Sequence, residues 1–240
     1  MSKLLLEKLV KIYRRRKVVN SVDLNVESGK VFGLLGPNGA GKTTIFYMAV
    51  GMIKPDEGKI SIDDEDITNC PMYIRARKGL GYLPQEPSIF RKLTVRENVM
   101  AILEMQPIPP KEQNERADRL LDELGISQLS NQRASLLSGG EKRRLEISRT
   151  LATEPTFILL DEPFAGIDPL AVLDIKNIII HLKNRGIGIL VSDHNVRETL
   201  DVCDMAYIIS DGKIIEAGSP EKIASSEIAR RIYLGDEFKL

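Results

Sequence analysis

The 240-residue sequence predicts an α/β fold: a mostly parallel sheet, an N-terminal antiparallel β subdomain, and a helical subdomain inserted between strands. Three observations predict it. Short apolar strands alternate with helix-compatible segments over residues 157–210, as in parallel α/β sheets. Apolar residues change to helical spacing over residues 86–151. A glycine-rich loop joins the apolar run at residues 31–35 to a helix-compatible segment at residues 45–50.

Composition excludes several classes of protein. Hydrophobic residues make up 42% of the chain, enough for a substantial core. Lys plus Arg and Asp plus Glu number 34 each, so the net charge does not favour nucleic acid as a partner. The two cysteines, Cys70 and Cys203, lack the spacing of metal ligands. We expect them to pack as small apolar side chains in a protein of a reducing compartment.

The sequence predicts a cytoplasmic protein. The N-terminal apolar run at residues 4–6 is too short for a signal peptide, and no small-residue cleavage site follows it. No uninterrupted apolar stretch reaches the roughly 18 residues that a membrane-spanning helix requires. We therefore expect any membrane role to depend on other subunits.

The first expected elements are strands at residues 4–13 and 18–26, which form an antiparallel pair. The basic turn between them, residues 14–17, is expected to be solvated. Strands follow at residues 59–62 and 79–83, the second ending at Pro84 and Gln85.

Helices are expected at residues 95–103, 111–124 and 141–151, with a proline-rich break at 107–110. Strands at 157–160, 188–192 and 205–210 then alternate with helices at 169–185 and 196–201. An edge strand at 213–217 and two short helices at about 220–234 close the chain. We expect one domain, with a core at about 1–85 and 152–240 and a helical subdomain at about 86–151.

The glycine-rich loop matches the pattern G-x-x-x-x-G-K-[ST] of a phosphate-binding loop. Its glycines let backbone N–H groups turn inward around a phosphate, and the helix that follows directs its positive dipole end at the same charge. The loop predicts binding of a nucleoside triphosphate, with Lys42 neutralising the β- and γ-phosphates. The residues expected to contact it are Gly36, Pro37, Asn38, Gly39, Ala40, Gly41, Lys42, Thr43 and Thr44.

Two carboxylates, Asp161 and Glu162, directly follow the apolar strand at 157–160. The carboxyl ends of parallel strands meet at one edge of a sheet, so both are expected beside the phosphate loop. We expect Mg²⁺ to be held by the Thr43 hydroxyl and by Asp161. Glu162 is then available to orient or deprotonate the attacking water.

Together these motifs resemble the ABC-type ATPases, and the resemblance covers nearly the whole chain. The deciding element is Leu-Ser-Gly-Gly-Glu at residues 137–141, which is similar to the signature loop of that family. The resemblance implies a P-loop NTPase fold with an ABC-type core. It also implies that Gln85 contacts the metal and γ-phosphate, His194 contacts the γ-phosphate, Asp168 contacts a second copy, and Tyr13 stacks on adenine.

The turn at residues 138–141 begins a helix, so it can present N–H groups to an anion. In the family that the sequence resembles, this turn faces the phosphate loop of another chain. The resemblance therefore implies a nucleotide-sandwich dimer in which Ser138, Gly139, Gly140 and Glu141 complete the partner's ATP site. Glu141 departs from the glutamine that is usual at its position, and residues 164–168 depart from the usual serine-containing dimer loop.

Residues 82–91, 192–200 and 233–240 further resemble the branch of the family that powers lipopolysaccharide export in Gram-negative envelopes. This implies two transmembrane partner subunits, a position on the cytoplasmic face of the inner membrane, and no contact with the transported substrate. Phe90 and Arg91 would dock the membrane partner.

Two alternatives remain open at this point. A sibling importer ATPase, such as the branched-chain amino-acid type, shares the core motifs. A soluble ABC ATPase of DNA repair or translation is disfavoured because such proteins usually carry a long coiled-coil insertion or two fused halves.

Overall fold

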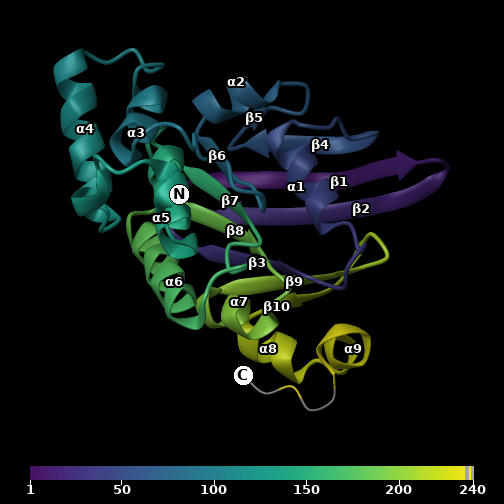
Figure 1. The fold of residues 1–240 in the computed structure, drawn as a ribbon. Coiled ribbons are helices and arrows are strands. Elements are labelled where there is room, and N and C mark those ends of the chain that lie inside the picture. The colour runs from purple at the N-terminus through teal and green to yellow at the C-terminus, as the bar shows by residue number, and fades with distance from the viewer. Residues whose placement is uncertain (236–237, 239–240) are drawn as a thin grey trace.

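The computed structural model describes residues 1–235 and 238, which form two sheets with helices packed against them (Figure 1). The N-terminal sheet is four-stranded and antiparallel, in the order β2-β1-β4-β5. Its strands are β1 (Lys3–Tyr13), β2 (Arg16–Glu27), β4 (Glu57–Ile62) and β5 (Glu65–Asp66). The expected antiparallel pair is confirmed, although the turn is shorter than expected because Arg16 and Lys17 already belong to β2.

The second sheet has six strands in the order β10-β9-β3-β8-β7-β6, and only the edge strand β10 runs antiparallel to its neighbour. Its strands are β3 (Val31–Leu35), β6 (Leu80–Leu83), β7 (Phe157–Asp161), β8 (Gly188–Ser192), β9 (Met205–Ser210) and β10 (Lys213–Gly218). Strands β3, β7 and β8 are buried at every position, which explains their continuous apolar sequence. Their carboxyl ends meet at one edge of the sheet.

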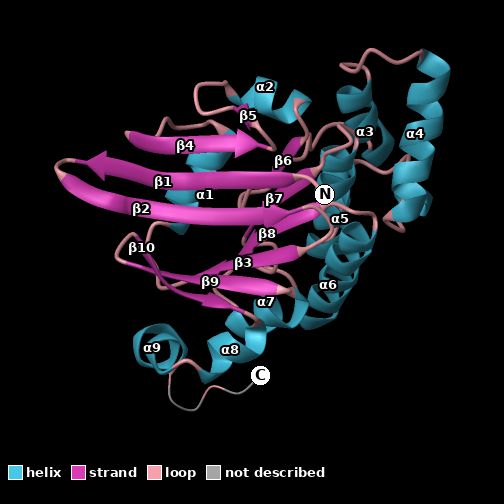
Figure 2. Ribbon diagram, turned by 180° about the vertical axis from the view of Figure 1, so that it is seen from behind, coloured by secondary structure: helices cyan, strands magenta, loops and turns pink. Residues whose placement is uncertain are grey.

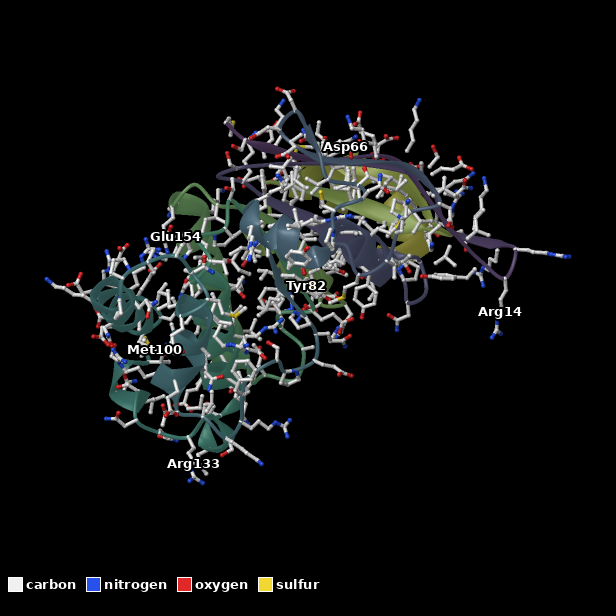
Figure 3. All side chains as sticks on the ribbon, turned by 90° about the horizontal axis from the view of Figure 1, so that it is seen from above. Arg14, Asp66, Tyr82, Met100, Arg133 and Glu154 are labelled. Atoms are coloured by element: carbon white, nitrogen blue, oxygen red, sulfur yellow. The ribbon has the colours of Figure 1, made fainter. Side chains whose placement is uncertain are left out.

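Helix α1 (Lys42–Val50) packs between the two sheets, behind β1 and β2 in the view of Figure 2. One buried apolar cluster includes Leu6 of β1, Phe46 of α1 and Leu159 of β7. The hairpin of β1 and β2 extends beyond this core, and Arg14 projects from its tip (Figure 3). The base of the hairpin is therefore fixed while its basic tip is exposed.

The helical subdomain contains α3 (Val95–Leu103), α4 (Pro110–Glu123) and α5 (Gly139–Leu151). Its apolar residues share one cluster with the six-stranded sheet, since Val99, Leu121 and Leu145 lie in the same core as Ile158 and Ile189. The helices expected at these positions are therefore confirmed, and the division of the chain into core and helical subdomain remains a prediction.

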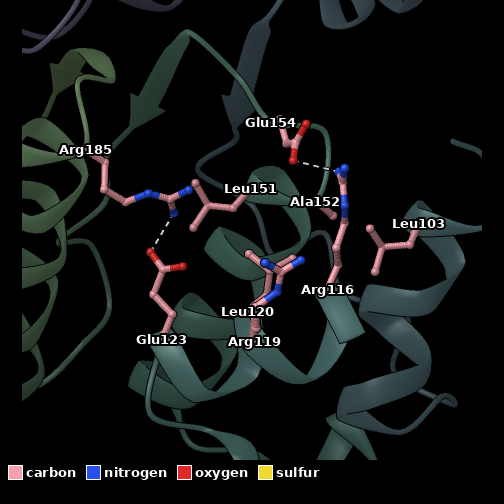
Figure 4. A pocket seen from close by; sticks show the side chains of 9 residues that line it. All are labelled: Leu103, Arg116, Arg119, Leu120, Glu123, Leu151, Ala152, Glu154 and Arg185. Atoms are coloured by element: carbon pink, nitrogen blue, oxygen red, sulfur yellow. Dashed lines mark hydrogen bonds and ion pairs between the residues drawn. The ribbon is translucent and has the colours of Figure 1, made fainter. Parts of the chain in front are cut away.

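Two ion pairs fasten α4 to the core around a cavity of about 140 Å³ (Figure 4). Arg116 Nη1 lies 2.7 Å from Glu154, which follows α5. Arg185 Nη1, beyond the end of α6 (Pro169–Asn184), lies 2.6 Å from Glu123 at the end of α4. The arginines of this cavity are thus partly neutralised by carboxylates of the same chain.

The remaining helices are α2 (Met72–Arg77), α7 (Val196–Val202), α8 (Pro220–Ser225) and α9 (Glu227–Ala229), with 3₁₀ turns at Ser127–Leu129 and Ala134–Leu136 and a π turn at Arg230–Leu234. Helix α2 was not expected from the sequence. Across residues 1–235 and 238, no helix is both long and apolar enough to cross a membrane.

Candidate nucleotide-binding site

The phosphate loop lies between β3 and α1 and is shaped by glycines that no other residue could replace. Gly41 has φ 113°, and a Cβ added there would lie 2.7 Å from the Val18 carbonyl oxygen. A Cβ added to Gly36 would lie 2.1 Å from the Ile209 carbonyl oxygen. The loop thus passes too close to neighbouring backbone for any side chain at these positions.

Helix α1 begins at Lys42, earlier than the apolar pattern indicated. Its N-cap residue is Gly41, and no side chain caps the first turn. The N–H groups at Lys42, Thr43 and Thr44 therefore lack a side-chain partner and are available to an anion. The apolar pattern did not predict this first turn of α1, because its polar residues belong to the phosphate loop and not to the apolar face of the helix.

Lys42 is buried, with only 8% of its surface exposed. Its Nζ donates to the carbonyl oxygens of Gly36 at 2.6 Å and of Pro37 at 3.1 Å. Burial lowers the pKa of Lys42, while the nearby charges of Glu162 and Asp161 oppose that shift. The loop thus encloses a cation that donates to neutral carbonyl groups, which a phosphate oxygen could replace.

Asp161 ends β7 and is almost completely buried, at 3% exposure. Burial, and then the charge of Glu162, raises the pKa of Asp161 to about 6. Tyr82 donates its hydroxyl to Asp161 Oδ2 at 3.4 Å, and Lys42 and Arg143 favour the charged form. An anionic carboxylate in this position is therefore destabilised until a further cation binds.

Glu162, the next residue, has a left-handed backbone conformation with φ 47°, which is rare outside glycine. Its N–H donates to the Ser192 carbonyl at 2.6 Å, tying the ends of β7 and β8 together. Gln85 Nε2 donates to Glu162 Oε2 at 2.7 Å, and His194 Nδ1 lies 3.5 Å from the same oxygen. The structure thus brings Gln85, Glu162 and His194 together, and we call them the Glu162 cluster.

Sequence reasoning missed two residues that support this cluster. Asp193 is fully buried; its carboxylate accepts the N–H of Asn195 at 2.8 Å and of Phe164 at 2.9 Å and lies 3.4 Å from His194 Nδ1. The sequence did contain a signal for Asp193, because it directly follows the apolar strand at 188–192. The same pattern was the reason for selecting Asp161.

Arg143 is the second missed residue. It is buried in α5 and donates to the carbonyl oxygens of Pro84 at 2.9 Å and Asp161 at 3.2 Å. It also pairs with buried Glu146 at 3.1 Å. No local sequence signal distinguishes it from a surface arginine, because its partners come from distant strands.

The turn at residues 138–141 lies apart from the phosphate loop within this chain. Ser138 is the N-cap of α5, and Gly139 and Gly140 are its first residues. Ser138, Gly140 and Glu141 line one cavity, which they share with Asp168, while Gly39 of the phosphate loop lines another with Arg16 and Lys17. One chain therefore holds two separate phosphate-compatible surfaces.

Four further predicted positions lie outside the Glu162 cluster. Asp168 caps α6, accepting the N–H groups of Leu170 at 3.1 Å and Ala171 at 3.0 Å. Tyr13, 45% exposed at the end of β1, lies under Lys11 Nζ, 5.6 Å from its ring centroid. Phe90 is 44% exposed, beside exposed Arg91.

A sequence profile of the ABC transporter family matches residues 19–165, which include the phosphate loop, the turn at 138–141 and the strand ending at Asp161. The chain belongs to the ABC transporter family. As a member of that family it is an ABC transporter ATPase and binds ATP, so the expected family and nucleotide are confirmed.

Relatives extend the match to the full length of the chain. It is 58% identical over 241 residues to the lipopolysaccharide export system ATP-binding protein LptB of Haemophilus influenzae, covering 100% of both chains. It is 54% identical over 241 residues, again covering 100% of both, to the protein of that name from Escherichia coli strain K12.

A solved structure described as the ADP conformation of an ATP-binding cassette of an ABC transporter superposes with a TM-score of 0.88 at 31% identity, covering 98% of this chain and 100% of the other. The predicted ABC ATPase fold, with its antiparallel β subdomain and mostly parallel sheet, is confirmed.

Proposed function

We propose that this chain is the ATP-hydrolysing subunit of a lipopolysaccharide exporter. In this proposal it works as a nucleotide-sandwich homodimer that binds two transmembrane subunits at the cytoplasmic face of the inner membrane. The observation that carries the proposal is identity of 54–58% over the full length of LptB proteins, well beyond the motifs that all family members share.

ATP binding uses groups that the structure leaves available. The phosphates would enter the loop at the uncapped start of α1, where they replace the carbonyl partners of Lys42. Tyr13 would stack on adenine from the end of β1. The partial exposure of Tyr13 is consistent with that role.

The donor set fits Mg²⁺. Among residues 1–235 and 238, no group of three or more His, Cys, Asp or Glu side chains could hold a metal. Mg²⁺ commonly takes one or two carboxylates and completes its shell with water and substrate phosphates. The buried Asp161 carboxylate, the Thr43 hydroxyl and the Gln85 side-chain oxygen would hold it, and the ion would neutralise charge on the β- and γ-phosphates.

Hydrolysis is assigned to the Glu162 cluster. The amide of Gln85 orients the Glu162 carboxylate, which would accept a proton from the water that attacks the γ-phosphate. His194 lies beside the same oxygen and would contact the γ-phosphate. Because Gln85 also begins the segment leading to the helical subdomain, its contacts would report nucleotide occupancy to that subdomain.

The site is completed by a second copy of the chain. The phosphate loop and the turn at residues 138–141 line different cavities, so one chain offers each ATP only half of its contacts. In the dimer, the partner's Ser138, Gly139 and Gly140 would donate to the γ-phosphate, and Asp168 would lie at the contact between copies.

The substitution Glu162→Gln tests the proposal. The variant should bind ATP, hydrolyse it at least about a hundredfold more slowly because the general base is lost, and accumulate as a dimer with MgATP. Sedimentation velocity and phosphate release measure the two effects. A variant that stays monomeric at saturating MgATP would contradict the sandwich, and one with wild-type turnover would contradict the role of Glu162.

A further inference from the structure

The side chain of Glu141 covers the start of α5, where the sandwich requires an anion-binding surface. Its Oε2 accepts both the N–H and the O–H of Ser138, each at 2.8 Å. In return, Ser138 Oγ accepts the N–H of Glu141 at 3.3 Å. Ser138 is exposed, so this arrangement is accessible to a second copy.

These contacts occupy the Ser138 hydroxyl, which is the donor that a phosphate needs. The oxygens of a γ-phosphate only accept hydrogen bonds, so a serine must offer its O–H proton to bind one. In this chain that proton points to the Glu141 carboxylate. The carboxylate is also an anion, and it repels the phosphate that approaches the same helix end.

We propose that Glu141 is a built-in competitor of the γ-phosphate, which must displace its carboxylate from Ser138 before two copies can close. The inference rests on the proposed sandwich. It says that the side chain of Glu141 sets the ATP concentration that the sandwich needs in order to close. Glutamine would keep an oxygen for the Ser138 N–H, but it carries no charge and accepts hydrogen bonds less strongly. Glu141 therefore raises the ATP concentration at which the dimer forms.

Helix α3 supplies a matched control. Its N-cap Thr94 and Glu97 form the same reciprocal box, with the Thr94 N–H donating to Glu97 at 2.7 Å and the Glu97 N–H donating to Thr94 Oγ1 at 3.1 Å. Thr94 does not belong to either phosphate-compatible surface. Glu97→Gln therefore reproduces the change in helix capping without the change at the ATP site.

The experiment uses the full chain carrying Glu162→Gln, with Glu141→Gln or Glu97→Gln added. Sedimentation velocity over a range of MgATP concentrations gives the concentration at which half of the protein is dimeric. Glu141→Gln should lower this MgATP concentration about three- to tenfold. The γ-phosphate then no longer has to break a hydrogen bond from Ser138 to a charged carboxylate at each site. Glu97→Gln should leave it unchanged, and unfolding midpoints show that each variant is folded.

Three outcomes overturn the inference, and one of them also overturns the sandwich. If the parent Glu162→Gln protein dimerises but Glu141→Gln leaves its threshold unchanged or raises it, Glu141 does not compete and the sandwich stands. If Glu97→Gln lowers the threshold equally, the effect comes from weakened helix capping and not from competition at the ATP site. If the parent does not dimerise at any MgATP concentration, the proposed function fails first.

Discussion

Asp161 shows how burial, at the scale of a single residue, could prepare a carboxylate for the metal role proposed for it. Its carboxylate is 3% exposed, and its ionised form lacks a full counter-ion because Lys42 instead donates to loop carbonyls. The neighbouring Glu162 adds a second negative charge, and its strained backbone persists because its N–H is fixed to Ser192. The pair is therefore less stable without nucleotide than with it.

This conflict predicts that Asp161→Asn stabilises the nucleotide-free protein. The pKa of Asp161 is raised from 3.8 to about 6, so the folded state binds a proton that the unfolded state has already released. Folding stability therefore falls as pH rises between about 4 and 6, and the loss persists above that window. At neutral pH the ionised carboxylate costs about 3 kcal/mol at most.

Urea unfolding in EDTA at pH 5 and pH 7.5 measures this effect. The advantage of Asp161→Asn should be larger at pH 7.5 than at pH 5. Asp168→Asn, at an exposed helix cap, should show no comparable gain at either pH. An Asp161→Asn protein that is less stable than wild type at pH 7.5 would show that the carboxylate is satisfied within the chain.

At the scale of elements, the segment between β6 and α3 connects the ATP site to the surface assigned to the membrane partner. Gln85 contacts Glu162, and three residues later the Ser88 N–H donates to Glu146 of α5 at 2.6 Å. Arg149 of α5 lies over the exposed ring of Phe90, 4.3 Å from its centroid. The segment is thus held to α5 while Phe90 stays available to a partner.

The double substitution Phe90→Ala and Arg91→Ala should therefore uncouple the membrane subunits and leave ATP binding intact. We expect at least about a tenfold loss of co-purifying transmembrane subunit, because truncating an aromatic hot spot at an interface costs about 2 kcal/mol or more. Binding of a fluorescent ATP analogue should stay at the wild-type level.

Tyr73→Ala with Arg77→Ala is the control, since Tyr73 is also exposed, at 62%, with the Arg77 guanidinium 5.8 Å from its ring centroid. It should leave the complex intact. Full recovery of the membrane subunits with the Phe90 and Arg91 variant would place the docking surface elsewhere.

The sequence predicted those features that depend on neighbours along the chain. The phosphate loop was recognisable because its chemistry needs consecutive residues, and strands β3, β7 and β8 because all their positions are buried. Contacts between distant segments were not accessible in this way. Gln85 and Glu162 are separated by 77 positions, and only the family resemblance assigned Gln85 to the site.

The buried arginine Arg143 was missed for the same reason. Its helix looked amphipathic, with charged residues expected at the surface, whereas its guanidinium is buried against the carbonyls of Pro84 and Asp161. Helices α1 and α5 began earlier than expected, at Lys42 and Gly139, because their first turns serve phosphate-compatible surfaces and carry no apolar pattern.

At the scale of the whole molecule, the two phosphate-compatible surfaces belong to parts held together by one apolar core. The cluster that contains Leu145 of α5 also contains Leu160 of β7. The ion pairs of Arg116 with Glu154 and of Arg185 with Glu123 fasten α4 to the same body (Figure 4). The proposed sandwich therefore needs a second copy to join the two surfaces around one ATP.

Cross-linking between differently tagged copies tests this central claim most directly. Asn38→Cys goes into one copy, where Asn38 is exposed in the phosphate loop, and Gly139→Cys into the other, where an added Cβ meets nothing closer than 3.5 Å. Both copies carry Glu162→Gln, with Cys70 and Cys203 replaced. A short dithiol-reactive linker should give a covalent dimer containing both tags only when MgATP is present. Nucleotide-bound protein that yields no such dimer would contradict the shared site.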